Sequence, residues 1–292
     1  MLKFYISENI ETIIICLILA NILSEVCSCI LLFILYKKDS ISYTKRAITT
    51  ITFKRIILKI AFPVSITSYI RSGLSTLKQF IIPSRLMLFG FTYAMALSKY
   101  GKINGMTMAL LTFPNVFIMS FSNLLIPEFS SLIAKQYKKR ILEVCKKVFF
   151  VTSIFSIFLS IIFYLLADKI SLLVFNNLEC AKYIKILSPI VLFIYTDNVL
   201  DSMLKGLNKQ FGVMFCNIID LILTICILYF TLPFLGITGY LLAIIVSEIF
   251  NFIVSYFQLY KATGFKPNFA ILLCYIFFVF LSLFNIYSNY LL

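Results

Sequence analysis

The stretch VFFVTSIFSIFLSIIFYLLA at residues 148–167 contains twenty residues and no charged side chain. A helix of about 20 apolar residues is long enough to cross the ~30 Å hydrocarbon core of a bilayer. Further apolar runs of similar length occur along the chain, so the sequence predicts an all-α, polytopic membrane protein with about eight transmembrane helices. The expected spans are 10–36, 56–82, 104–133, 148–167, 184–205, 212–233, 237–259 and 269–291.

The basic residues are unevenly distributed between the connections. Most of the 26 lysines and arginines lie in 37–59, in 135–147, or at Lys205, Lys209, Lys261 and Lys266, which follow alternate spans. Loops rich in lysine and arginine stay in the cytoplasm, so both chain termini are expected outside. The net charge of +14 then reflects this loop bias and an attraction to anionic membrane lipids. Nucleic acid is not expected as a partner.

The composition gives no sign of an enzyme. The chain has no histidine, which removes the commonest general base and the usual zinc motifs. Its 9 glycines are scattered and form no phosphate loop, and most of its 8 cysteines sit in apolar runs, where a thiol behaves as a small hydrophobe. We therefore predict no catalytic residue, no cofactor and no metal.

Polar and charged residues are concentrated in the second expected span. A charge at the centre of a bilayer costs about 2.5–3.5 kcal/mol on insertion scales, so this helix is expected to line a water-filled cavity. Arg71 and Lys78 are seven residues apart and therefore share one helix face. The predicted substrate-binding residues are Arg71, Lys78, Ser68, Ser72 and Ser75. For Lys78 the alternative is that its ammonium only reaches the lipid headgroups.

Three residues are predicted to let these helices bend or approach a ligand. Pro114 and Pro127 lie in the third expected span, where each removes a backbone donor and kinks the helix. Gly73 would let the backbone of the second span come close to a ligand. We therefore expect hinges or kinks at Gly73, Pro114 and Pro127.

Carboxylates occur inside three of the later spans. Asp197, Asp201 and Lys205 follow one another at intervals of four residues, so Asp201 is placed to pair with Lys205. The predicted cation or proton site consists of Asp197, Asp201, Asn217, Asp220 and Glu248. The alternative is structural, because these groups can also satisfy one another or neutralise Arg71. In that case the expected partner of Arg71 is Asp197 or Glu248.

Several short motifs resemble one family in the same order along the chain. They are ILKIAFPVSITSYIRSGLSTLK at 57–78, LTFP at 111–114, LIPE at 125–128, MLKGLN at 203–208, NIID at 217–220, GITGY at 236–240 and KATGF at 261–265. Over about residues 1–268 the chain resembles the second lobe of the stage V sporulation protein B family, within the superfamily of multidrug, oligosaccharidyl-lipid and polysaccharide exporters. The resemblance implies a flippase for a lipid-linked saccharide, such as a peptidoglycan precursor used in sporulation, in the bacterial plasma membrane.

The same resemblance implies how the chain is divided. Residues 1–36 would be the last helix of a first lobe, 37–55 a basic cytoplasmic linker, 56–262 a six-helix lobe, and 263–292 an additional transmembrane helix. Members of this superfamily have two lobes, and an alternating-access cavity is built between two such repeats. We therefore expect a truncated or split product, with a second lobe supplied by another copy or by a separate chain. The alternatives are an inactive membrane fragment or scaffold, and a cation-coupled multidrug exporter of the same fold.

Overall fold

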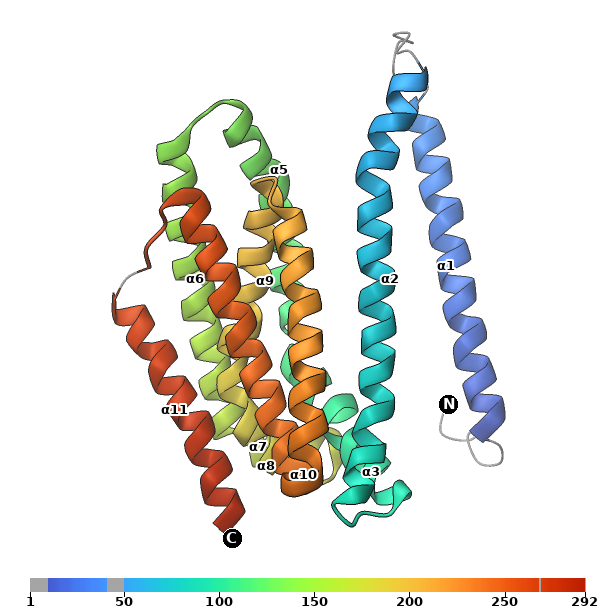
Figure 1. Cartoon of the computed structure of the whole chain (residues 1–292), viewed down its shortest axis with the longest axis vertical. Helices are drawn as coiled ribbons and strands as arrows, with labels where there is room; N and C mark the ends of the chain where they lie inside the picture. Colours follow the sequence, from blue (N-terminus) through green and yellow to red (C-terminus); the bar gives the residue numbers. More distant parts are fainter. Residues whose placement is uncertain (1–9, 41–49, 268, 292) are drawn as a thin grey trace. The chain divides into compact units, whose positions relative to one another are not determined.

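The computed structural model describes residues 10–40, 50–267 and 269–291, and all the regular structure in these ranges is helical (Figure 1). The helices are α1 (Ile10–Ser40), α2 (Thr50–Leu88), α3 (Tyr93–Tyr100), η2 (Gly101–Met108), α4 (Ala109–Thr112), α5 (Asn115–Ala134), α6 (Lys138–Leu165), α7 (Ala167–Phe175), α8 (Glu179–Leu187), η3 (Ser188–Ile190), α9 (Val191–Gly206), α10 (Gln210–Thr263) and α11 (Phe269–Leu291).

Five helical segments within the described ranges are long and apolar enough to cross a membrane. They are Ile18–Lys38, Asn115–Ala134, Lys138–Leu165, Glu179–Gly206 and Gln210–Thr263. The helix α11 adds a shorter apolar stretch, Leu273–Ser288. The prediction of an all-α, polytopic membrane protein is confirmed.

By packing, the chain separates into two units, Met1–Ala61 and Phe62–Leu292. The first unit contains α1, whose large apolar side chains are exposed around the helix, for example Leu19, Leu23 and Leu32. Exposed apolar residues on all sides suit a helix that is surrounded by lipid. The boundary falls inside α2, and α11 belongs to the second unit together with the helices that precede it.

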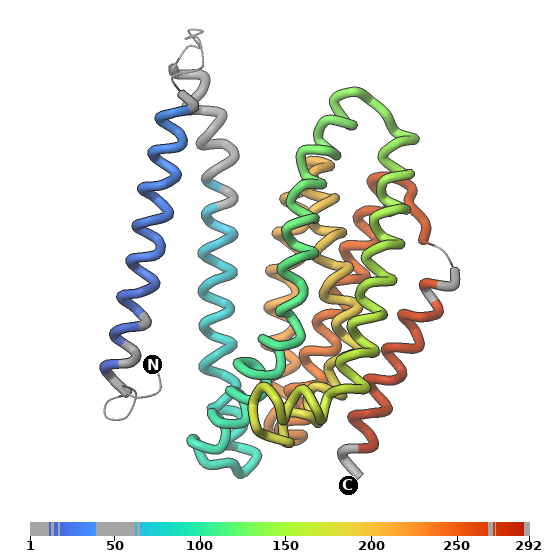
Figure 2. The backbone as a smooth tube through the Cα atoms, turned by 180° about the vertical axis from the view of Figure 1, so that it is seen from behind, coloured from blue at the N-terminus to red at the C-terminus, as the bar shows by residue number. Residues whose placement is uncertain are grey.

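The core of the second unit is built around α9. This helix packs against α5, α6 and α10 (Figure 2), and its apolar side chains are buried on every side, as at Leu192, Val199 and Met203. At one end of α9, Phe193 and Phe252 surround the ring of Tyr275, with centroid distances of 5.1 and 4.6 Å. These rings tie α9, α10 and α11 together.

The long helix α10 is a hairpin of two arms. Gly236 has φ 55° and ψ −129°, so the chain reverses there and residues 210–235 and 237–263 form separate arms. A Cβ atom at this position would lie 2.8 Å from the ring of Phe89, so both the positive φ and the close contact require glycine. The two expected spans at 212–233 and 237–259 are therefore found as the arms of α10.

The helix α2 extends beyond the expected span 56–82. The helix continues to Leu88, and the chain turns only at Gly90, where φ is 111°. Pro83 lies inside the helix and leaves the carbonyl of Gln79, four residues earlier, without its helical donor. Here Ser84 Oγ donates to the carbonyl oxygens of Phe80 and Ile81, at 3.0 and 2.9 Å. The short helix α3 follows this turn.

The prediction of one continuous span at 104–133 is wrong. The segment consists of the π-helix η2, the short helix α4, a turn at Phe113–Pro114, and α5, which alone is long enough to cross a membrane. Pro114 lacks the N–H that would continue the helix, and the hydroxyl of Tyr195 donates to the carbonyl of Leu111 at 2.6 Å. Pro127 lies inside α5 without interrupting it. The helices α7 and α8 occupy a region that was expected to be a connection.

The bond between Tyr195 and Leu111 predicts a change in stability. In Tyr195→Phe the Leu111 carbonyl stays buried and loses its donor, so we expect the free energy of unfolding to fall by about 1–3 kcal/mol. Thermal unfolding of the purified chain in detergent measures this. The matched variant Tyr137→Phe alters an exposed side chain and should leave the unfolding temperature unchanged. Equal unfolding temperatures for the two variants would contradict the structural role of this bond.

Candidate functional site

The helix α9 and the two arms of α10 bring the predicted carboxylates to one region inside the membrane-crossing helices. Asp197 and Asp201 lie one turn apart on α9, and Asp220 lies on the first arm of α10, with Glu248 on the second. Ser255 Oγ donates to Asp201 Oδ1 at 3.1 Å. The second arm therefore contacts the carboxylates of α9 directly.

Asp220 is also held by the second arm of α10. Ser247 Oγ donates to Asp220 Oδ1 at 2.6 Å, and Asn251 adds a hydrogen bond. Asn217, one turn earlier on the first arm, hydrogen-bonds to Asp201. Serine and asparagine side chains thus connect the two aspartates of α9 and α10 into one polar cluster, which we call the carboxylate cluster (Asp197, Asp201, Asn217, Asp220, Glu248).

The carboxylate cluster has unused hydrogen-bonding capacity. Asp197 Oδ1 is buried and has no hydrogen-bond partner in the part of the chain that the structure describes, and the same holds for Thr224 Oγ1, one turn beyond Asp220. Buried polar atoms are normally paired, so such atoms are open to a proton, a water molecule or a cation. Among the described residues, no group of three or more His, Cys, Asp or Glu side chains is arranged to hold a metal ion.

The expected pairing of Asp201 with Lys205 is wrong in this conformation. The ion pairs within 4.0 Å between described residues do not include these two, although Lys205 still acts electrostatically on Asp201. One carboxylate oxygen accepts from Ser255 instead. The helix geometry allows the pair, but the second arm of α10 lies close enough to provide a competing donor.

The cations of α2 act on the same cluster. Arg71 acts electrostatically on Asp201 and Asp220, and Lys78 acts on Asp220 and Glu248. Because both reach Asp220, the two basic side chains share a face of α2, as their spacing predicts. The structural alternative expected Asp197 or Glu248 to neutralise Arg71. The carboxylates on which Arg71 acts electrostatically are instead Asp201 and Asp220. Lys78 is half-buried, and the alternative that its ammonium only reaches the lipid headgroups stays a prediction.

A cavity of about 280 Å³ lies between α2, α9 and α10, and we call it the anion cavity. Its polar lining comes from Thr67, Ser68, Arg71, Lys205, Gln210 and Asn217. Two of these side chains are cationic and none is a carboxylate. The cavity therefore suits an anionic group, and Asn217 connects it to the carboxylate cluster.

The other predicted substrate residues lie outside the anion cavity. Ser72 accepts a hydrogen bond at its carbonyl from Thr76 Oγ1, at 3.0 Å. Gly73 lines a larger hollow of about 880 Å³ with residues of α2 and α3, among them Phe80 and Tyr93. Ser75 is half-buried and lines neither cavity. Of the predicted substrate residues, Ser68 and Arg71 line the anion cavity together with Lys205, which the sequence singled out only as a partner for Asp201, and Gln210, which it did not single out.

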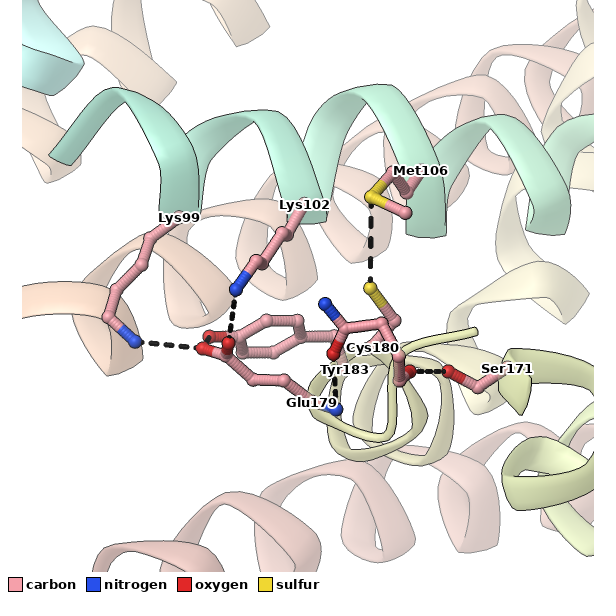
Figure 3. A network of polar contacts seen from close by, with 8 residues as sticks. Lys99, Lys102, Met106, Ser171, Glu179, Cys180 and Tyr183 are labelled. Carbon is pink, nitrogen blue, oxygen red and sulfur yellow. Dashed lines mark hydrogen bonds and ion pairs between the residues drawn. The ribbon is translucent and has the colours of Figure 1, made fainter. Parts of the chain in front are cut away.

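A second polar network, which was not predicted, joins α3 and η2 to α8 (Figure 3). Lys99 Nζ lies 2.8 Å from Glu179 Oε1, and Lys102 binds the other carboxylate oxygen. Tyr183 Oη donates to Glu179 at 3.2 Å, and Cys180 Sγ approaches Met106 Sδ at 3.9 Å. Two lysines on one glutamate, Lys99 from α3 and Lys102 from η2, connect these helices to the start of α8, which leads through η3 into α9.

The chain is thus a polytopic helical protein in which carboxylates of α9 and α10 lie near a cavity lined by two cationic side chains. The chain is similar to stage V sporulation protein B of Bacillus subtilis (strain 168), with 24% identity over 239 residues. This match covers 79% of the chain and 46% of that protein, so the chain spans about half the length of the curated relative that it matches. No protein-family model matches the chain. No solved structure matches it either.

Proposed function

We propose that this chain forms part of a carrier that translocates a lipid-linked saccharide across the bacterial plasma membrane. The observation that carries the proposal is the anion cavity with Arg71 and Lys205, placed beside the carboxylate cluster within membrane-crossing helices. The similarity to a sporulation protein supports a substrate of the peptidoglycan-precursor type and a role in sporulation.

The lining of the anion cavity suits a pyrophosphate. The planar guanidinium of Arg71 presents paired donors that match phosphate oxygens, whereas the ammonium of Lys205 acts as a point charge. Ser68 and Gln210 add neutral donors on either side. Lipid-linked saccharides carry a phosphate or pyrophosphate between lipid and sugar, so this group would bind at Arg71 and Lys205.

The polar face of α2 supports a second lobe as partner. Ser65, Ser68, Arg71 and Ser72 are exposed in the second unit, and a charged residue that faces lipid is expensive. A second lobe, supplied by another copy or by a separate chain, would cover this face and complete the cavity. Without such a lobe the chain would be an inactive membrane fragment or scaffold.

The carboxylate cluster favours a second candidate, a cation-coupled multidrug exporter of the same fold. Asp197, which has no ion pair within 4.0 Å among the described residues and whose Oδ1 is buried, also suits a cationic drug or a coupling ion. The two candidates differ in the charge of the substrate. Binding of an anionic lipid depends on Arg71, whereas binding of a cationic drug depends on the carboxylates.

Equilibrium binding of a lipid-linked saccharide pyrophosphate to the purified chain tests the proposal. Arg71→Lys keeps the charge and removes the paired donors, so we expect at least about tenfold weaker binding, which corresponds to about 1.4 kcal/mol. The control is Arg140→Lys, which alters an exposed arginine paired with Glu143 and should bind like the wild type. Unchanged binding in Arg71→Lys, or displacement of the lipid by a cationic drug, would contradict the proposed substrate.

A further inference from the structure

A cavity of about 590 Å³ opens at the end of the bundle where α5 meets α6 and α9 meets α10, the upper end of the bundle in Figure 1. Its polar lining consists of Gln136 and Lys138 from the α5–α6 connection, Lys209 from the α9–α10 connection, and Thr263 from the end of α10. We call it the basic end cavity. It is separate from the anion cavity, with which it shares no lining residue.

The helices α5 and α9 each end near the basic end cavity in a cap that satisfies carbonyls of their last turn. Gln136 and Asn208 adopt left-handed conformations, with φ of 56° and 61°. The amide that follows each of them donates a hydrogen bond back to the helix. Tyr137 N–H donates to the Leu132 carbonyl at 3.0 Å, and Lys209 N–H donates to the Leu204 carbonyl at 2.9 Å. Such caps satisfy the last carbonyls of a helix. The negative ends of α5 and α9 are thus covered by their own amides.

The charge of the basic end cavity is entirely positive. Lys138 and Lys209 are its charged lining residues, and neither has an ion pair within 4.0 Å in the described ranges. A neighbouring hollow of about 480 Å³ shares Gln136 and Lys138 and adds Lys139, together with Arg140 and its ion-pair partner Glu143. Two adjoining hollows therefore concentrate positive charge around the first turn of α6.

The remaining lining of the basic end cavity is apolar and lies next to the expected membrane boundary. Ile133, Ile141 and Leu207 contribute aliphatic side chains. The membrane-crossing segment Asn115–Ala134 ends beside the cavity, and the segment Lys138–Leu165 begins beside it. A ligand here would have its charged part at the headgroup level and an apolar part against the helices. This combination is typical of lipids rather than of soluble anions.

From this geometry we infer that the basic end cavity binds the phosphate headgroup of an anionic phospholipid of the surrounding leaflet. Lys138 and Lys209 contact the phosphate from two different helix connections, while Ile141 and Leu207 contact the start of the acyl chains. The lipid would bridge the α5–α6 and α9–α10 connections, and so would hold α9 and its carboxylates in place from outside the transport site.

Lipid retention by the full chain tests this inference. The chain is placed in nanodiscs that contain phosphatidylglycerol, phosphatidylcholine or both, and bound lipid is counted by native mass spectrometry after release into detergent. We expect retention of phosphatidylglycerol and not of phosphatidylcholine. The double variant Lys138→Gln/Lys209→Gln should bind phosphatidylglycerol at least tenfold more weakly. The variant Lys138→Arg/Lys209→Arg keeps both charges and should restore binding.

Two controls keep the outcome interpretable. Lys169→Gln removes an exposed lysine of α7 that lines none of the cavities described above and should retain the lipid like the wild type. Arg71→Lys tests the transport site and should also retain it. The inference is overturned if the glutamine double variant, folded as judged by an unchanged unfolding temperature, binds phosphatidylglycerol normally. It is also overturned if inorganic phosphate displaces the lipid at equal concentration, because the site would then prefer a soluble anion.

Discussion

Replacing Asp220 by asparagine is expected to reduce ion-dependent transport by at least about tenfold while leaving expression near normal. The asparagine keeps the shape of the side chain and an oxygen that can accept from Ser247, which lies 2.6 Å from Asp220 Oδ1. It removes the negative charge that would bind a proton or a cation, and on which Arg71 and Lys78 act. Transport should therefore become insensitive to the coupling ion, although the packing of the two α10 arms is preserved.

The measurement is uptake or flipping in vesicles that contain this chain with the lobe that completes its cavity, with and without an ion gradient. Asp168→Asn is the matched control, because Asp168 pairs with Lys185 at 2.6 Å on a partly exposed surface. It removes one carboxylate outside the cluster and should transport like the wild type. A structural role for Asp220 predicts the opposite pattern, in which the unfolding temperature falls and the ion dependence is unchanged.

The all-α membrane fold followed directly from the sequence, because a bilayer admits few alternatives to a helix for a long apolar run. Helix ends were predicted less well. The second span was expected at 56–82, but α2 continues through Pro83 to Leu88.

The candidate site was predicted in part. The polar spacing on α2 identified Arg71, and the carboxylates of α9 and α10 could be recognised because charges inside apolar runs are rare. Their partners could not be predicted from periodicity within one helix. Ser255 lies 54 residues from Asp201, and Lys99 lies 80 residues from Glu179. Such contacts depend on how helices pack, so the network in Figure 3 became visible only in the folded chain.

Gly206→Ala is expected to lower the free energy of unfolding by about 1–3 kcal/mol, the usual cost of overfilling a packed site. At the end of α9, an added Cβ atom would lie 2.7 Å from Phe129 Cβ and 2.9 Å from the carbonyl oxygen of Ile126. Neither atom can move away easily, because one is the Cβ of a fully buried residue and the other is backbone. The helices α5 and α9 would therefore have to separate.

The control for this substitution is Gly105→Ala, because nothing lies within 4 Å of a Cβ atom there. Alanine is favoured over glycine inside a helix by about 0.5–1 kcal/mol, so this variant should unfold at the wild-type temperature or above it. Thermal unfolding in detergent compares the two, and an equal unfolding temperature for both would contradict the close approach of α5 and α9.

Since Lys205 precedes Gly206 and lines the anion cavity, separation of the helices should also weaken binding of the lipid-linked saccharide. Lost stability and weaker binding together in Gly206→Ala, with neither in Gly105→Ala, would connect the α5–α9 contact to the transport site.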